Sequence, residues 1–315
     1  MRAFVFNYIG DRGGLADVAP PQPLDGEILI QVNAVGLVAS DWRVRAGSRK
    51  GRQEHVFPAI LGFDFAGQVV EVPDGSDDWA PGDRLYGIAH KPYIGAGSLG
   101  ELLAMPAGGP MAPTPVFLTD VEAAAVVSGW LTSLAALDEV VVEAGDVVAL
   151  TGASGGVGSV LTQLLARRGA EVVAVARSAN RDYVEWLGAS RVVCRDQVDV
   201  VAELLSLSPG GVDTLVDLVG DAARFDELVG AVREGGQASS AVAAADAERL
   251  AGRDLKLSNV RTKPSAERLL SLEEEWGRQE LALPEIETLD LSEAANGIDR
   301  LERGEGRGKL VVTVP

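Results

Sequence analysis

The segment from Val147 to Arg181 constrains the fold more than any other part of the chain. It begins with an apolar run, VVALT, which is typical of a strand buried on both faces. A glycine-rich turn, GASGGVG, follows, and apolar residues then recur at helical spacing. A second apolar run, EVVAVA, comes next. Strand, turn, helix and strand in this order predict a βαβ unit with two parallel strands.

The glycine-rich turn has the spacing of a dinucleotide-binding loop, in which the second and third glycines are Gly155 and Gly158 and the first is replaced by Ala153. Gly155 would let the backbone approach a pyrophosphate, and Gly158 would let helix and strand pack closely. The helix N-terminus would offer unpaired amides to the phosphates. The expected phosphate-binding residues are Ser154, Gly155, Gly156, Val157 and Gly158.

The end of the second strand indicates which dinucleotide is bound. NAD-binding units place an acid about 20 residues past the loop, where it accepts hydrogen bonds from ribose hydroxyls. No acid occurs here between Glu171 and Asp182. Arg177, Ser178 and Arg181 occur instead, and guanidinium groups suit a 2′-phosphate that a carboxylate would repel. The sequence therefore predicts NADPH as the cofactor.

Bulk properties exclude several classes of protein. A length of 315 residues is typical of two domains, and a net charge of −18 disfavours binding to nucleic acid or to an anionic membrane. We expect no membrane span, because no apolar run approaches about 18 residues. Cys194 is the only cysteine, so no internal disulfide can form. The chain starts with a strand-like run and without a signal-type core, so we expect a cytoplasmic protein.

The pattern of elements changes along the chain. The first third contains strand-like runs separated by turns, one of them at 73–76, and a helix with Thr119 as its cap begins near residue 119. Strands and helices then alternate, which predicts a doubly wound parallel sheet of the Rossmann type. Its expected strands lie at 147–151, 171–176, 191–193, 212–219, 237–242 and 255–262.

The last run, GKLVVTVP, has no place in that parallel sheet and is expected to return to the β-rich part. We therefore predict an α/β protein with a β-rich domain at 1–117, completed by 264–315, and a Rossmann domain at 118–263.

Eight segments in order resemble the medium-chain dehydrogenase/reductase superfamily, in its zinc-free quinone oxidoreductase (zeta-crystallin-like) branch. They are FPAILGFDFAGQVVEV, WAPGDRLYGI, GSLGELLAMPA, GWLTSLAAL, VVALTGASGGVG, LGASRVV, VDTLVDLVG and RGKLVVTV. The resemblance implies a GroES-like catalytic domain, a Rossmann domain and a cleft between them. It also implies NADPH-dependent reduction of a quinone, enone or related carbonyl, and a homodimer formed through the edge of the Rossmann sheet.

No zinc site is expected. The zinc-containing branch of the superfamily needs cysteine and histidine ligands. This chain has one cysteine and two histidines, His55 and His90, and it has Phe63 and Asp64 where zinc enzymes carry histidine and glutamate.

The resemblance also implies catalytic positions, two of which are altered. Relatives carry an asparagine, an aspartate and a tyrosine where this chain has Val38, Asp41 and Arg43. Without a metal, hydrogen-bond donors must polarise the substrate oxygen. The candidate catalytic residues are Asp41, Arg43, Tyr93 and Thr132.

Further cofactor contacts follow from the same resemblance. Thr132 matches a threonine near the nicotinamide half of the cofactor, and Val219 ends a strand at the carboxyl edge of the sheet. Arg195 is a third candidate partner for the 2′-phosphate. The segment expected to run beside the nicotinamide contains Ser240, Ala241 and Val242.

Three functions remain open at this point. The first is a zinc-independent, NADPH-dependent oxidoreductase acting on a small quinone, enone or related carbonyl. The second is an enoyl-thioester reductase, which shares the fold and the hydride chemistry. The third is a non-catalytic NADPH-binding redox sensor, which the altered positions Val38 and Arg43 keep open. A small-molecule substrate is the expected partner in the first two cases.

Overall fold

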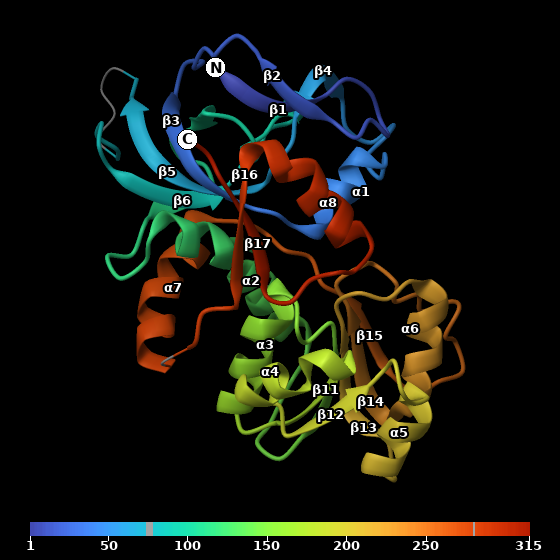
Figure 1. Ribbon diagram of the computed structural model, residues 1–315. Coiled ribbons are helices and arrows are strands. Elements are labelled where there is room, and N and C mark those ends of the chain that lie inside the picture. The colour runs from blue at the N-terminus through green and yellow to red at the C-terminus, as the bar shows by residue number, and fades with distance from the viewer. Residues whose placement is uncertain (74–77, 280) are drawn as a thin grey trace. The chain divides into compact units, whose positions relative to one another are not determined.

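The computed structural model describes residues 1–73, 78–279 and 281–315 (Figure 1). The chain divides into two compact units. The first comprises Met1–Ser128, Pro264–Trp276 and Leu283–Pro315, and the second comprises Gly129–Lys263 and Gly277–Ala282. The chain passes from the first unit to the second within helix α2 (Asp120–Glu139). This helix begins with the predicted capping box, in which the Thr119 amide donates to the Glu122 carboxylate at 2.8 Å.

The first unit is rich in β-structure. One sheet has the strand order β2-β1-β4-β7, and a second has the order β16-β17-β3-β5-β6-β9, with β8 also beside β3. The strands are β1 (Arg2–Phe6), β2 (Gly14–Asp17), β3 (Glu27–Gly36), β4 (His55–Ile60), β5 (Asp64–Glu71), β6 (Arg84–Ile88), β7 (Ile94–Ala96), β8 (Leu102–Pro106), β9 (Met111–Pro113), β16 (Ile286–Asp290) and β17 (Lys309–Thr313). The terminal strand β17 therefore lies in the second sheet, antiparallel to β3.

Alternating burial explains how β3 forms the centre of this unit. Ile28, Ile30 and Val32 are fully buried, whereas Gln31 between them is exposed. The helices of this part of the chain are α1 (Ala39–Arg45), α7 (Ala266–Gln279) and α8 (Ala294–Glu302), with a 3₁₀ turn η3 (Leu291–Glu293) before α8. Ile298 of α8 is buried in the same core as β3.

The second unit confirms the predicted Rossmann sheet. All its neighbouring strands are parallel, in the order β12-β11-β10-β13-β14-β15. These strands are β10 (Val147–Thr151), β11 (Glu171–Ala176), β12 (Arg191–Cys194), β13 (Val212–Asp217), β14 (Val232–Ser240) and β15 (Lys256–Asn259). β10 and β11 are buried along almost their whole length, as strands covered on both faces require.

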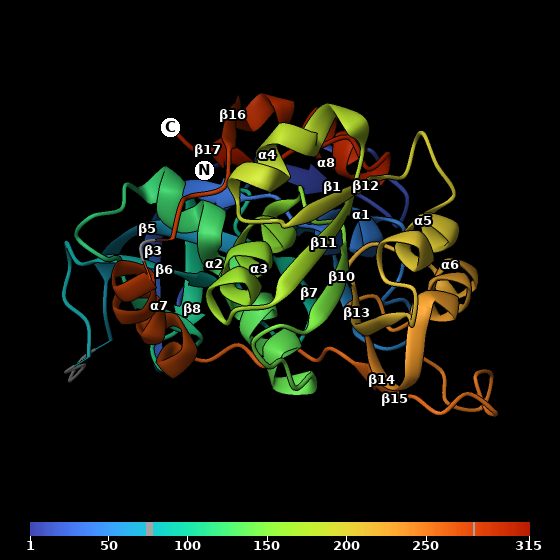
Figure 2. The same cartoon turned by 90° about the horizontal axis from the view of Figure 1, so that it is seen from below.

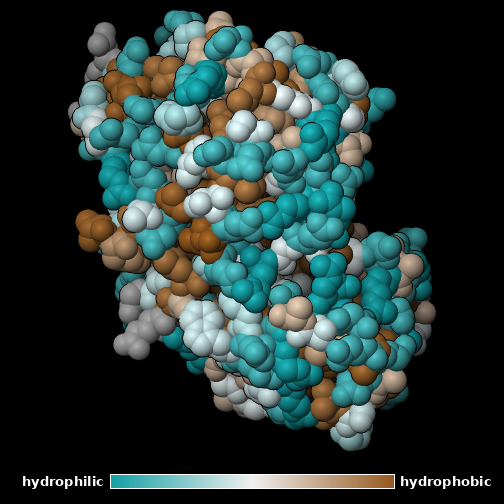
Figure 3. All heavy atoms as spheres, in the orientation of Figure 1, coloured by the Kyte–Doolittle hydropathy of each residue, from teal (hydrophilic) through white to brown (hydrophobic). Residues whose placement is uncertain are grey.

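Helices cover both faces of the parallel sheet. They are α3 (Gly156–Arg167), α4 (Arg181–Trp186), α5 (Val200–Leu207) and α6 (Ala222–Leu228), with 3₁₀ turns η1 (Ser178–Asn180) and η2 (Val229–Ala231). Figure 2 shows α3 on one side of the sheet and α5 and α6 on the other. Hydrophilic residues predominate on the face drawn in Figure 3, in keeping with the net charge of −18.

Local predictions failed in several places. β14 and β15 end at Ser240 and Asn259, and not at residues 242 and 262. Helix α1 was not anticipated, and His55, expected in a charged loop, begins β4. β13 ends at Asp217 and not at residue 219, because the Asp217 carboxylate accepts the Gly220 amide at 3.1 Å and turns the chain. Apart from Pro73, the turn predicted at 73–76 lies outside the described residues.

Candidate functional site

The glycine-rich loop joins β10 to α3, as predicted, and its glycines have different reasons to lack a side chain. A Cβ on Gly158 would lie 2.2 Å from the Gly152 carbonyl oxygen, so tight packing excludes a larger residue. A Cβ on Gly155 would meet only that same oxygen, at 3.5 Å, and would otherwise face open space. Gly155 caps α3, whose first amides have no partners within the helix. The loop therefore leaves space at Gly155, where a phosphate would approach, and is tightly packed at Gly158.

Thr132 lies close to this loop. The Ser133 hydroxyl beside it donates to the Val157 carbonyl at 3.3 Å, which ties the second half of α2 to the start of α3. The Thr132 hydroxyl is 3.3 Å from the hydroxyl of Thr262, a residue that follows β15. Thr132 is thus held at the carboxyl edge of the sheet, the edge at which ligands bind in open α/β folds.

Asp217 organises the middle of the same edge. Its carboxylate accepts the Thr151 hydroxyl at 2.5 Å, and burial raises the pKa of Asp217. The turn that it holds places Val219 beside Gly152, where a Cβ on the glycine would come within 2.7 Å of the valine side chain. Val219 is 63% exposed, which is unusual for a large apolar residue at the end of a core strand and suits contact with a ligand.

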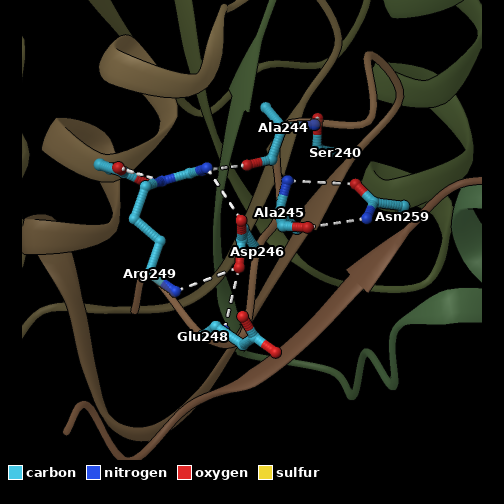
Figure 4. Close-up of polar contacts among 8 residues, drawn as sticks. Ser240, Ala244, Ala245, Asp246, Glu248, Arg249 and Asn259 are labelled. Carbon is cyan, nitrogen blue, oxygen red and sulfur yellow. Dashed lines mark hydrogen bonds and ion pairs between the residues drawn. The ribbon is translucent and has the colours of Figure 1, made fainter. Parts of the chain in front are cut away.

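The segment after β14 is fixed by polar contacts (Figure 4). The Ser240 hydroxyl accepts the amides of Val242 and Ala244 at 3.2 and 3.1 Å. Asn259 of β15 pairs with both backbone groups of Ala245, at 3.1 and 2.8 Å. The predicted segment Ser240–Val242 therefore lies at the carboxyl edge with a defined backbone, as a contact with a planar ligand ring would require.

Two arginines follow adjacent parallel strands. The register pairs Ala176 with Cys194, so Arg177 and Arg195 leave neighbouring strand ends, and the Arg195 amide donates to the Ala176 carbonyl at 3.0 Å. Burial, together with the positive charges of Arg177 and Arg224, lowers the pKa of Arg195. Among the described residues, no side-chain hydrogen bond or ion pair engages Arg177 or Arg195. Such a concentration of positive charge is typical of an anion site.

The structure gives the other predicted phosphate ligands different partners. The Arg181 guanidinium contacts the Cys194 sulfur at 3.1 Å and Glu185 at 3.3 Å, so it is turned toward β12 and along its own helix. The Ser178 hydroxyl donates to Asp196 at 2.7 Å. The Asn180 amide donates to the Ser154 hydroxyl at 3.0 Å, which links this strand end to the phosphate loop.

Asp196 was not among the predicted site residues. The chain that follows β11 carries no acid before Asp182, whereas Asp196 follows β12 and lies beside Ser178 because of the register of the sheet. Parallel pairing of the expected strands at 171–176 and 191–193 would have predicted that the residues following them lie close together.

The three remaining catalytic candidates belong to the first unit. Asp41 is fully buried and accepts the amides of Val38 at 2.7 Å and Gly62 at 3.2 Å. In this structure the Asp41 carboxylate therefore holds the first turn of α1, and its catalytic role stays a prediction. Arg43 lies over the Trp42 ring, 5.3 Å from its centroid, and Tyr93 is half-buried just before β7.

A buried charged cluster surrounds Asp41. The neighbouring Asp64, also fully buried, accepts the Lys309 ammonium at 2.8 Å and the Ser128 hydroxyl at 2.5 Å. Burial raises the pKa of Asp41 to about 7, and the negative charge of Asp64 adds to this effect. The cluster joins β5, β17 and the start of α2.

No group of three or more potential metal ligands occurs within residues 1–73, 78–279 and 281–315. By length and composition, α2 alone among the described helices could cross a membrane, but 67% of its apolar window is buried inside the protein, as in the core helix of a globular fold.

Comparisons with known proteins place both parts of the chain. The alcohol dehydrogenase GroES-like domain matches residues 24–115, and the zinc-binding dehydrogenase family matches residues 156–276, together more than half of the chain. A chloroplast envelope quinone oxidoreductase homolog from Arabidopsis thaliana is 32% identical over 61% of this chain and 60% of its own length. A spectinabilin polyketide synthase system protein, NorB from Streptomyces orinoci, is 30% identical over 94% of this chain.

The match covers 13% of the much longer Streptomyces protein, so this chain spans only part of the curated relatives that it resembles. Among solved structures, the quinone oxidoreductase from Coxiella burnetii has a TM-score of 0.88 and 28% identity. That match covers 100% of this chain and 99% of the Coxiella chain.

Proposed function

Because the chain belongs to the medium-chain dehydrogenase/reductase superfamily, in its quinone oxidoreductase-like branch, we propose that it is an NADPH-dependent oxidoreductase that reduces a small quinone, enone or related carbonyl compound without zinc. The names of the Arabidopsis and Coxiella relatives support this class of substrate.

One observation carries the choice of cofactor. Arg177 and Arg195 leave adjacent strand ends of the Rossmann sheet, on a chain whose net charge is −18, and the positive charges of Arg177 and Arg224 act on Arg195 together with one nearby acid, Asp196. A 2′-phosphate next to them would relieve this repulsion, whereas the hydroxyl of NADH would not. The open face of Gly155 would admit the pyrophosphate.

A bound reduced nicotinamide would supply the hydride that the reaction needs. The residues of this chain would position it: the fixed Ser240–Val242 backbone, the exposed Val219 and the Thr132 hydroxyl all lie at the carboxyl edge. We exclude zinc from the proposal on the donor set, because Phe63 is not a ligand and Asp64 is already occupied by Lys309 and Ser128.

The test is a double variant, Arg177→Ala/Arg195→Ala, with dissociation constants for NADPH and NADH measured by titration calorimetry. We expect NADPH affinity to fall about 100-fold and NADH affinity to change by less than about threefold, since charge-assisted contacts to a phosphate are lost only for NADPH. Arg181→Ala is the control for the loss of a single guanidinium group, because its side chain is turned toward Cys194. Equal losses for both nucleotides would reject NADPH as the preferred cofactor.

A second candidate is an enoyl-thioester reductase. The match to a polyketide synthase system protein, which covers 94% of this chain, favours it. Oxidation of NADPH should be followed with a panel of quinones, enones and crotonyl thioesters. Turnover of the thioester alone would select the second candidate, and tight NADPH binding without turnover of any of them would indicate a redox sensor.

A further inference from the structure

An acid occupies the place where the proposed cofactor should carry its extra negative charge. Asp196 accepts two hydrogen bonds from one residue, from the Ser178 amide at 2.8 Å and from the Ser178 hydroxyl at 2.7 Å. Arg195, the residue before it, is electrostatically coupled to Asp196 and to Arg177. Two donors and nearby guanidinium groups therefore converge on a carboxylate.

The same set of donors suits a phosphate. A carboxylate and a phosphate both accept short, charge-assisted hydrogen bonds from amides and hydroxyls, and both pair with guanidinium groups. Ser178 follows β11, where the adenosine ribose binds in dinucleotide-binding folds. The two anions cannot share these donors, since like charges at hydrogen-bond distance repel strongly.

The position of Asp196 allows its side chain to move away from Ser178. The residue is exposed and lies in the turn after β12, so its side chain can rotate into solvent without opening the core. Its departure would free the Ser178 amide and hydroxyl, while Arg177 and Arg195 would remain in place.

We propose that the Asp196 carboxylate is an internal substitute for the 2′-phosphate of NADPH: it binds Ser178 in the cofactor-free protein and is exchanged for the phosphate when NADPH binds. The inference rests on the proposed function. It makes Asp196 a determinant of cofactor affinity and selectivity that acts against NADPH, and Ser178 the group that changes partners.

Asp196→Asn tests the exchange, because the amide keeps an acceptor for Ser178 and loses the negative charge. We expect NADPH to bind about tenfold more tightly to the variant and NADH to change by less than about twofold. Ser178→Ala should weaken NADPH binding. In combination with Asp196→Asn, it should cancel the gain in NADPH affinity. Asp182→Asn, a nearby exposed acid on α4, is the matched control and should change neither constant. Thermal unfolding checks the fold of each variant, and Asp196→Ser is measured in place of Asp196→Asn if that variant does not fold.

The outcomes separate this inference from the proposed function. If wild-type protein prefers NADPH and Asp196→Asn does not bind it more tightly, the exchange is wrong. A selective loss of NADH affinity in Asp196→Asn would also overturn it, because Asp196 would then hold the ribose hydroxyls. If wild-type protein shows no preference while the variant gains NADPH affinity, the exchange stands and the NADPH dependence of the wild-type protein is rejected.

Discussion

Two clusters of charge, one in each unit, use the same kinds of side chain in opposite surroundings. In the first unit, Lys309 and Asp64 are 5% and 0% exposed and bind each other directly. In the second unit, Arg177 and Arg195 lie near an exposed acid, Asp196, and have no ion pair within hydrogen-bonding distance among the described residues. The charges of the first cluster are buried and form an ion pair. The arginines of the second cluster are at least partly exposed to solvent and form no direct ion pair among the described residues.

The difference indicates that the first cluster stabilises the fold and that the second is available to bind a ligand. A charge removed from water needs a partner, because its desolvation costs several kcal/mol. Lys309, which is buried and paired with Asp64, is therefore not accessible to a ligand from solvent. At the strand ends, water screens the repulsion between guanidinium groups, so they can stay unpaired until an anion arrives. Changes to the first cluster should alter stability, and changes to the second should alter cofactor binding.

The largest expected effect comes from Lys309→Met. Removing the ammonium leaves Asp64 and the neighbouring Asp41 buried without the cation that binds Asp64. We expect the free energy of unfolding to fall by about 3–5 kcal/mol, measured by urea unfolding at neutral pH. Arg177→Ala/Arg195→Ala should stay within about 0.5 kcal/mol of wild type in the same assay.

The double variant Lys309→Met/Asp64→Asn serves as the control, because it removes both charges and should recover part of the loss. A Lys309→Met protein within about 1 kcal/mol of wild type would break the contrast between the two clusters, since the buried pair would then be dispensable.

The two loop glycines should show the same contrast: substitution of Gly158 should lower stability, and substitution of Gly155 should lower cofactor affinity. Gly158→Ala forces a Cβ to 2.2 Å from a backbone oxygen, so we expect a loss of about 3 kcal/mol in stability. Gly155→Ala meets nothing closer than 3.5 Å and should leave stability within about 0.5 kcal/mol of wild type. It should still weaken NADPH and NADH alike, because the pyrophosphate is common to both. Urea unfolding measures the stability of both variants, and titration calorimetry measures their affinity for NADPH and NADH. A Gly158→Ala protein as stable as wild type would contradict the packing argument.

Much of the fold could be predicted from the sequence, whereas the contrast between the two charge clusters could not, for physical reasons. The βαβ unit was predictable because hydrophobic period and glycine spacing are local properties, and β10 and β11 are parallel as expected. Asp196 was not, because it reaches Ser178 through the pairing of β11 with β12, which no local pattern reports. The burial of Asp41 was not predictable either, since it depends on the packing of β5 and β17 around it.

The smallest expected effect concerns Asp41 and sharpens the contrast through pH. Its pKa is about 7 in the folded protein against a reference value of 3.8, so between these values the folded state holds a proton that the unfolded state has lost. The free energy of unfolding should therefore fall as pH rises through this window, by about 2 kcal/mol between pH 5 and pH 7. Asp41→Asn, which mimics the protonated form, should lack this component, because its amide does not titrate. Urea unfolding of both proteins at pH 5, 6, 7 and 8 isolates the effect as the difference between the two curves. That difference should grow in favour of the variant as pH rises. A constant difference would mean that Asp41 is already charged at pH 5 and that Lys309 stabilises both buried acids together.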